Sequence, residues 1–213
     1  MRVQFESPMD RLRLEWDKKA AGDALAASCP DRTDWTPASF QASGEELFAA
    51  RVATGLPVWA SAMGAAPGEF RVLDLGCGAG RLLRPARAAC AEVHAVDVSP
   101  KMLARARELA DGLTEIRFAV SDGLSLQCVN RQTYHLALCV DVLGHQPTDT
   151  FVRYLLGQIQ DKLLPAGVVV ADLPPTWTTA RIDTMLAMLR LTRIGVEAAP
   201  DRVWLQLQKP PAP

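Results

Sequence analysis

The feature that most constrains this chain is a run of alternating glycines directly after a short apolar stretch. Residues 71–75 (Arg-Val-Leu-Asp-Leu) have the composition of a buried strand, and Gly76, Gly78 and Gly80 follow before a helical pattern begins. Glycines at alternate positions let the backbone approach another group closely, because no Cβ stands in the way. The stretch therefore predicts a strand, a tight glycine-rich turn and a helix, arranged around a ligand.

Beyond this turn the chain alternates between strand and helix patterns. Such alternation favours an α/β fold with a mainly parallel sheet that is covered by helices on both faces. Strands are expected at 70–75, 93–98, 116–120, 136–142, 168–173, 194–198 and 203–207, and helices at 80–89, 100–109, 148–164 and about 182–189. Gly167 is expected to close the helix over 148–164. The last two strands are too close for a crossover helix, so they should form an antiparallel hairpin.

Residues 1–69 are expected to form a helical segment in front of the main domain, which spans residues 70–213. Ser7 is a suitable N-cap for a first helix with Pro8 at its first position, and Cys29-Pro30-Asp31 should break it. Ser43 and Glu46 have the spacing of a capping box and predict a second helix. Pro57 should end or kink that helix, and residues 64–68 should form a linker.

The overall composition argues against several classes of protein. The 213 residues carry a formal net charge of -1, which gives no electrostatic reason to expect nucleic acid or an anionic membrane as a partner. The five cysteines contain no Cys-x-x-Cys pair, so we expect reduced thiols in a cytoplasmic protein rather than a zinc site or disulfides. The first residues do not form a signal peptide, and no apolar run is long enough to span a membrane.

The spacing of the glycines limits which kinds of ligand the turn could bind. A dinucleotide fingerprint would need a third glycine at the position of Arg81 or Leu83, and no Walker Lys-Ser/Thr follows. Asp97 should end the next strand, where a carboxylate can accept both hydroxyl hydrogens of a ribose. Asp122 should follow the third strand, where an acid can accept from an adenine amine, and Met102 could cover the adenine ring. The expected ligand has an adenine, a ribose and a compact polar group.

These motifs resemble those of class I S-adenosylmethionine-dependent methyltransferases. The resemblance rests on residues 72–81 (Val-Leu-Asp-Leu-Gly-Cys-Gly-Ala-Gly-Arg), 96–103, 121–123 and 164–170, and it covers roughly residues 70–209. It implies a Rossmann-like sheet of seven mostly parallel strands in the order 3-2-1-4-5-7-6, with one antiparallel strand. It also implies S-adenosyl-L-methionine as cofactor, with residues 1–69 covering the cofactor and shaping the substrate pocket. The implied contacts are Asp74 near the amino group, Gly76, Gly78 and Gly80 beneath the methionine portion, Asp97 on the ribose, and Met102 and Asp122 around the adenine. Cys77, Val98 and Gly123 complete the expected cofactor set, with the Cys77 thiol as a small buried filler.

Two residues after the fourth strand are candidates for catalysis. His145 could deprotonate a hydroxyl or an amine, or it could only support its loop. Asp141 could orient a ligand or satisfy local backbone donors. Asp141 with Asp172 could in principle hold magnesium, but Leu173 stands where metal-dependent relatives carry Asn, so no metal is expected. Trp16, Trp35 and Trp177 could line an acceptor pocket or belong to the core.

The sequence therefore predicts an enzyme that transfers a methyl group from S-adenosylmethionine to an oxygen or nitrogen of a small molecule. Two alternatives remain open: a partner subunit that binds the cofactor without catalysis, and another group transfer, such as aminopropyl transfer from the decarboxylated cofactor. Nothing in the sequence indicates the oligomeric state.

Overall fold

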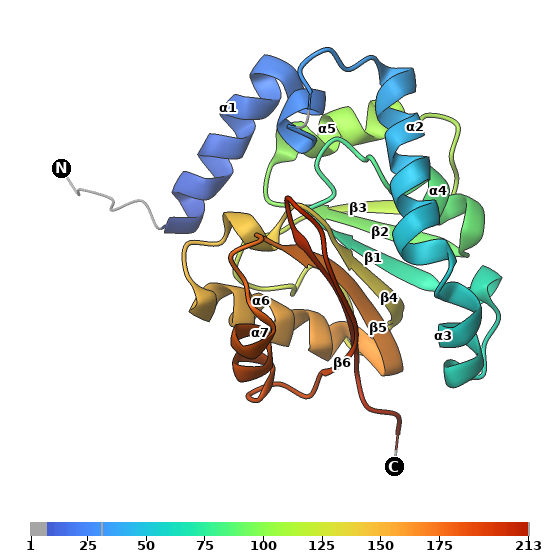
Figure 1. The fold of residues 1–213 in the computed structure, drawn as a ribbon. Coiled ribbons are helices and arrows are strands. Elements are labelled where there is room, and N and C mark those ends of the chain that lie inside the picture. The colour runs from blue at the N-terminus through green and yellow to red at the C-terminus, as the bar shows by residue number, and fades with distance from the viewer. Residues whose placement is uncertain (1–7, 31, 213) are drawn as a thin grey trace.

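A computed structural model describes residues 8–30 and 32–212 of the chain. Its centre is a seven-stranded sheet in the order β3-β2-β1-β4-β5-β7-β6, as predicted (Figure 1). All neighbouring strands are parallel except that β7 runs antiparallel to both β5 and β6. The strands are β1 (Arg71–Leu75), β2 (Glu92–Asp97), β3 (Ile116–Val120), β4 (Tyr134–Cys139), β5 (Leu163–Leu173), β6 (Thr192–Ala198) and β7 (Val203–Gln208).

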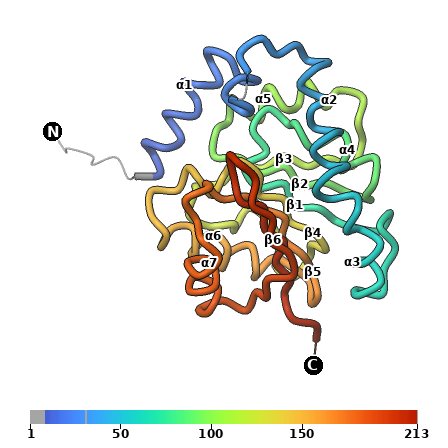
Figure 2. Tube along the Cα trace, viewed as in Figure 1, coloured from blue at the N-terminus to red at the C-terminus, as the bar shows by residue number. Residues whose placement is uncertain are grey.

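Helices cover both faces of the sheet, because its strands alternate apolar side chains between two separate cores. Leu73 of β1 packs in the core with α6 and α7, whereas its neighbour Val72 packs in the core with α3, α4 and α5. Figure 2 shows these two groups of helices on opposite sides of the strands. The helices are α3 (Leu56–Met63), α4 (Leu83–Ala89), α5 (Pro100–Leu109), α6 (Asp149–Lys162) and α7 (Thr179–Leu186).

The first helix, α1 (Pro8–Ser28), is two helical pieces joined at a kink. Asp23 has non-helical dihedral angles, φ -145° and ψ 101°. Its Oδ1 accepts hydrogen bonds from the backbone N–H groups of Leu25 and Ala26, so it acts as the N-cap of the second piece. The helix ends at Ser28, as the break at residues 29–31 predicts. The predicted cap Ser7 and the breaker Asp31 lie outside the described residues.

The predicted start of the second helix is wrong. Helix α2 spans Pro37–Phe48 and is capped by Thr36, whose hydroxyl accepts from the Ser39 N–H while the Ser39 hydroxyl accepts from the Thr36 N–H. Ser43 lies inside this helix, where its hydroxyl donates to the carbonyl of Phe40. Pro37 explains the earlier start, because proline suits the first turn of a helix.

Two further predicted helix ends are also wrong. Pro57 does not end α2, which runs into a π-helical turn (η1, Ala49–Ala53); Pro57 lies instead in the first turn of α3. Gly167 does not close α6, because β5 already begins at Leu163 and contains Gly167. The residue with a positive φ there is Ala166, at +60°.

Candidate cofactor and acceptor site

One cavity lies at the carboxyl ends of β1, β2 and β4, where open parallel sheets bind ligands. It brings together ten of the predicted site residues: Asp74, Gly76, Cys77, Gly78, Asp97, Val98, Met102, Gly123, Asp141 and His145. Residues of α1 and α2 close it from the other side, among them Leu12, Trp16, Ala27, Ser28 and Leu47. Gly80 and Asp122 are not among its lining residues.

The first and last glycines of the turn, Gly76 and Gly80, have different neighbours. Gly76 has a φ of +70°, and a Cβ there would lie 2.2 Å from Cγ2 of Val142, so the turn and the loop after β4 are in close contact. Gly80 has a φ of +88°, and a Cβ there would lie 3.2 Å from the Cβ of Ala106 on α5. Gly80 therefore brings the turn against α5 instead of lining the cavity.

Asp97 joins the glycine-rich turn to the start of α5. Its Oδ2 accepts from the Gly78 N–H at 2.9 Å and its Oδ1 accepts from the Ser99 N–H at 2.8 Å. Burial raises the pKa of Asp97, while these two hydrogen bonds act in the opposite direction. The carboxylate is thus held rigidly at the edge of the cavity.

Asp74, at the end of β1, is an acid with a strongly perturbed pKa. Its Oδ2 is buried and has no hydrogen-bond partner within the described residues. Burial, reinforced by the negative charge of Asp97, raises the pKa of Asp74 to about 7. A buried carboxylate oxygen without a donor is unfavourable, so this position calls for a positively charged or hydrogen-bonding ligand group.

Two further lining residues are Met102, which is buried on α5, and Gly123, in the loop after β3. Asp122 is exposed and faces its own loop: its carboxylate accepts from the N–H groups of Leu124 and Ser125. The structure therefore does not bring Asp122 together with the other predicted cofactor residues.

Helix α1 contacts the glycine-rich turn through Ser28. The Ser28 hydroxyl accepts from the Ala79 N–H at 2.8 Å and lies 3.6 Å from the sulfur of Met102. A second link joins Asp17 to the hydroxyl of Ser99 at 2.6 Å. The N-terminal segment is thus attached both to the glycine-rich turn and to the start of α5.

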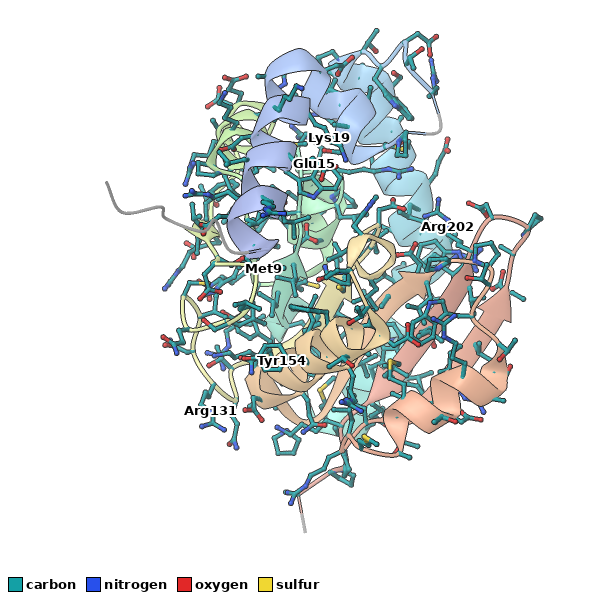
Figure 3. All side chains as sticks on the ribbon, turned by 90° about the vertical axis from the view of Figure 1, so that its left-hand side faces the viewer. Met9, Glu15, Lys19, Arg131, Tyr154 and Arg202 are labelled. Atoms are coloured by element: carbon teal, nitrogen blue, oxygen red, sulfur yellow. The ribbon has the colours of Figure 1, made fainter. Side chains whose placement is uncertain are left out.

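His145, in the short helix η3 (Leu143–His145), lines the cavity beside α1. Its ring meets that of Trp16 edge to face, with centroids 5.0 Å apart. Partial burial and the nearby charge of Lys19 lower the pKa of His145, against the opposing charges of Asp141 and Glu15. Figure 3 shows Glu15 and Lys19 on α1 and Arg202 in the region of the β6–β7 hairpin.

Asp141 lies at the end of β4 and takes part in an ionic network. It has a φ of +57°, and its N–H donates to Oδ1 of Asp172 at 2.7 Å. Arg202 bridges the two acids, with Nη1 2.8 Å from Asp141 Oδ1 and 3.3 Å from Asp172 Oδ2. Burial and the Asp141 charge raise the pKa of Asp172 to about 6. Within residues 8–30 and 32–212, no group of three His, Cys, Asp or Glu side chains has an arrangement that could hold a metal ion.

Comparison with known proteins identifies the fold family. The family described as "Methyltransferase domain" matches residues 72–167. Nodulation protein S of Sinorhizobium fredii is 27% identical over 131 residues, which are 59% of this chain and 60% of that protein. Residues 72–167, a little under half of the 213 residues, are thus similar to a methyltransferase domain.

Two solved structures support this assignment of the fold. Magnesium protoporphyrin IX methyltransferase from Synechocystis, with bound S-adenosylmethionine, has a TM-score of 0.69 at 18% identity, over 98% of this chain and 100% of that one. The N-methyltransferase NodS from Bradyrhizobium japonicum, in complex with S-adenosylhomocysteine, has a TM-score of 0.64 at 20% identity, over 93% and 98% of the two chains.

The cavity fits the cofactor of this family. S-adenosylmethionine carries an ammonium group, for which the unpartnered oxygen of Asp74 is a suitable acceptor, and a ribose, for which Asp97 is one. None of the helices in residues 8–30 and 32–212 is long and apolar enough to cross a membrane.

Sequence reasoning missed Ser28 and Arg81 as cavity residues and left Trp16 undecided. Arg81 directly follows the last glycine of the turn, and this position could have indicated from the sequence that it lines the cavity. Ser28 gave no signal, because its contact with Ala79 spans 51 positions of the chain. Trp35 packs instead against Phe40, and Trp177 is buried in the core beside α6 and α7.

Proposed function

We propose that this chain transfers the methyl group of S-adenosylmethionine to an oxygen or nitrogen atom of a small molecule. The observation that carries this proposal is that eight of the ten predicted cofactor residues and the two candidate catalytic residues line the same cavity. Asp74 and Asp97 lie at the glycine-rich turn, and Asp141 and His145 lie on the neighbouring loop after β4.

When bound, the cofactor supplies an electrophilic methyl group on a sulfonium. The chain's own contribution is then mainly to position the reactants and to exclude water. Asp97 would bind the ribose and Asp74 the ammonium group. Helix α1 would cover the site, because Trp16 and Ser28 line the cavity from the side opposite the strands.

His145 is suited to accept a proton from the acceptor. Its pKa lies below its ordinary value of 6.5, so the ring is neutral at pH 7 and one nitrogen can act as a base. Asp141 would act beside it as an orienting group, since Arg202 and the hydrogen bond to Asp172 fix its position.

The acceptor side of the cavity favours a small molecule. Leu12, Trp16 and Leu155 give it apolar walls, and Gln146 adds one amide. The formal net charge of -1 gives no electrostatic reason to expect a nucleic acid as substrate. Amines are the first acceptors to test, because one structural relative is described as an N-methyltransferase.

Labelled cofactor provides the direct test. The purified chain is incubated with S-adenosylmethionine carrying a trideuterated methyl group, together with separated low- and high-molecular-mass fractions of a cell extract. We expect a labelled product in the low-mass fraction, and mass spectrometry then locates the methyl group on nitrogen or oxygen. Label in the high-mass fraction only would contradict a small-molecule acceptor. Cofactor binding with no labelled product would favour the alternative of a non-catalytic partner subunit.

A further inference from the structure

Arg81 is the only lysine or arginine among the described residues that line the cavity. Three carboxyl groups line it as well, those of Asp74, Asp97 and Asp141. A ligand carboxylate that enters this cavity meets three acids and one cation, so Arg81 is the side chain that can attract it.

The position of Arg81 is fixed by helix α2. Its Nε donates to the Ser43 hydroxyl at 3.1 Å, and that hydroxyl itself donates to the Phe40 carbonyl at 2.7 Å. The backbones of α2 and of Arg81 are also in close contact, because a Cβ at Gly44 would lie 1.9 Å from the Arg81 carbonyl oxygen. The guanidinium group is therefore positioned before any ligand arrives.

The terminal nitrogens of Arg81 remain available for a ligand. Within the described residues the acid beside them is Asp141, whose Oδ2 lies 3.8 Å from Nη1, which is too long for a hydrogen bond. The other oxygen of Asp141 is bound by Arg202 at 2.8 Å. A guanidinium whose side chain is only 15% exposed, with unused parallel donors, is well suited to bind a carboxylate.

The amino-acid end of the family's cofactor has the complementary charges, since one carbon carries both its ammonium and its carboxylate. Asp74 and Arg81 flank the glycine-rich turn, one before it and one after it. We propose that Arg81 binds the cofactor's carboxylate and makes the site selective for the carboxylated cofactor over its decarboxylated form. This inference rests on the proposed use of S-adenosylmethionine. It also opposes the alternative of aminopropyl transfer, because the donor in that reaction lacks the carboxylate.

The test compares two ligands that differ only in this carboxylate: S-adenosylhomocysteine and its decarboxylated analogue, S-adenosyl-3-thiopropylamine. Both are titrated by calorimetry into the wild type, Arg81→Gln and the control Arg105→Gln, whose arginine pairs with Glu108 on the exposed side of α5. We expect the wild type and the control to bind S-adenosylhomocysteine at least tenfold more tightly than the analogue. In Arg81→Gln this preference should shrink to about twofold, with little change for the analogue.

The ratio of the two affinities separates ligand binding from a structural role. If Arg81→Gln keeps the full preference, or loses affinity equally for both ligands, the inference is wrong. Arg81→Lys, which keeps the charge but not the parallel donors, should show an intermediate preference and replaces the glutamine variant if that one does not fold. A wild type that binds neither ligand would instead refute the proposed function, and this inference with it.

Discussion

The buried carboxyl group of Asp74 should make the ligand-free protein less stable as the pH rises, and Asp74→Asn should remove this effect. In the folded chain the pKa of Asp74 is raised from 3.8 to about 7, because burial and the charge of Asp97 disfavour its ionised form. Between these two pH values the unfolded chain has lost a proton that the folded chain still holds. The free energy of unfolding therefore falls from about pH 4 to about pH 7 and levels off above it.

The size of the effect follows from the same pKa. At about 1.4 kcal/mol for each pH unit, a rise from 3.8 to about 7 corresponds to at most about 4 kcal/mol. Between pH 4 and pH 8 the free energy of unfolding of Asp74→Asn should thus rise by up to about 4 kcal/mol relative to that of the wild type. Because the amide cannot pair with an ammonium group as the carboxylate does, the variant should also bind S-adenosylhomocysteine about tenfold more weakly at pH 8.

The assay is urea unfolding of both proteins without ligand at several pH values from 4 to 8, followed by calorimetric titration with S-adenosylhomocysteine. Asp111→Asn, on the exposed turn after α5, is a suitable control and should follow the wild type in both measurements. Unfolding curves of Asp74→Asn that run parallel to those of the wild type across this pH range would refute the reasoning about the buried charge.

Three other substitutions test separate parts of the site. His145→Gln should lower kcat/KM for the acceptor about a hundredfold and abolish its decline below the His145 pKa; an unchanged pH profile would remove His145 from the mechanism. Gly80→Ala should cost about 2 kcal/mol more in urea unfolding than Gly112→Ala, because both have a positive φ but only the former meets neighbouring atoms; equal costs would contradict this. Arg202→Gln should raise KM for the acceptor about tenfold, because it removes the bridge between Asp141 and Asp172. A parallel loss of affinity for S-adenosylhomocysteine would instead argue for a wider structural role of Arg202.

The elements that could be predicted from sequence are those with strong local signals. Helix α5 begins at Pro100 and ends at Leu109, as expected, because Ser99 caps it and proline suits its first turn. Strand β3 likewise has its expected bounds. The order of the strands came from the resemblance to a family, since no local pattern specifies which strands pair.

The wrong predictions arose where two local signals compete. Thr36-Pro37 and Ser43-Glu46 are both reasonable helix starts, and the structure uses the first. Tertiary packing agrees with this choice, because Gly44 must be inside a helix that lies directly against Arg81. Asp122, in the loop after β3, is ambiguous in the same way. A carboxylate at such a position can face a ligand or its own backbone, and the sequence around it is the same in both cases.

The division of the cavity between two parts of the chain indicates where acceptor specificity resides. The glycine-rich turn and Asp97 lie within the matched residues 72–167 and are the residues predicted to bind the cofactor. Trp16 and Leu12 come from the N-terminal segment, outside the matched residues 72–167; both line the cavity, and the Trp16 ring meets that of His145. Because their contacts join residues far apart in the chain, no local pattern located Leu12, and the sequence left Trp16 open between an acceptor pocket and the core. Replacing Trp16 and Leu12 by other residues should therefore change which acceptor the protein uses and leave the use of the cofactor unchanged.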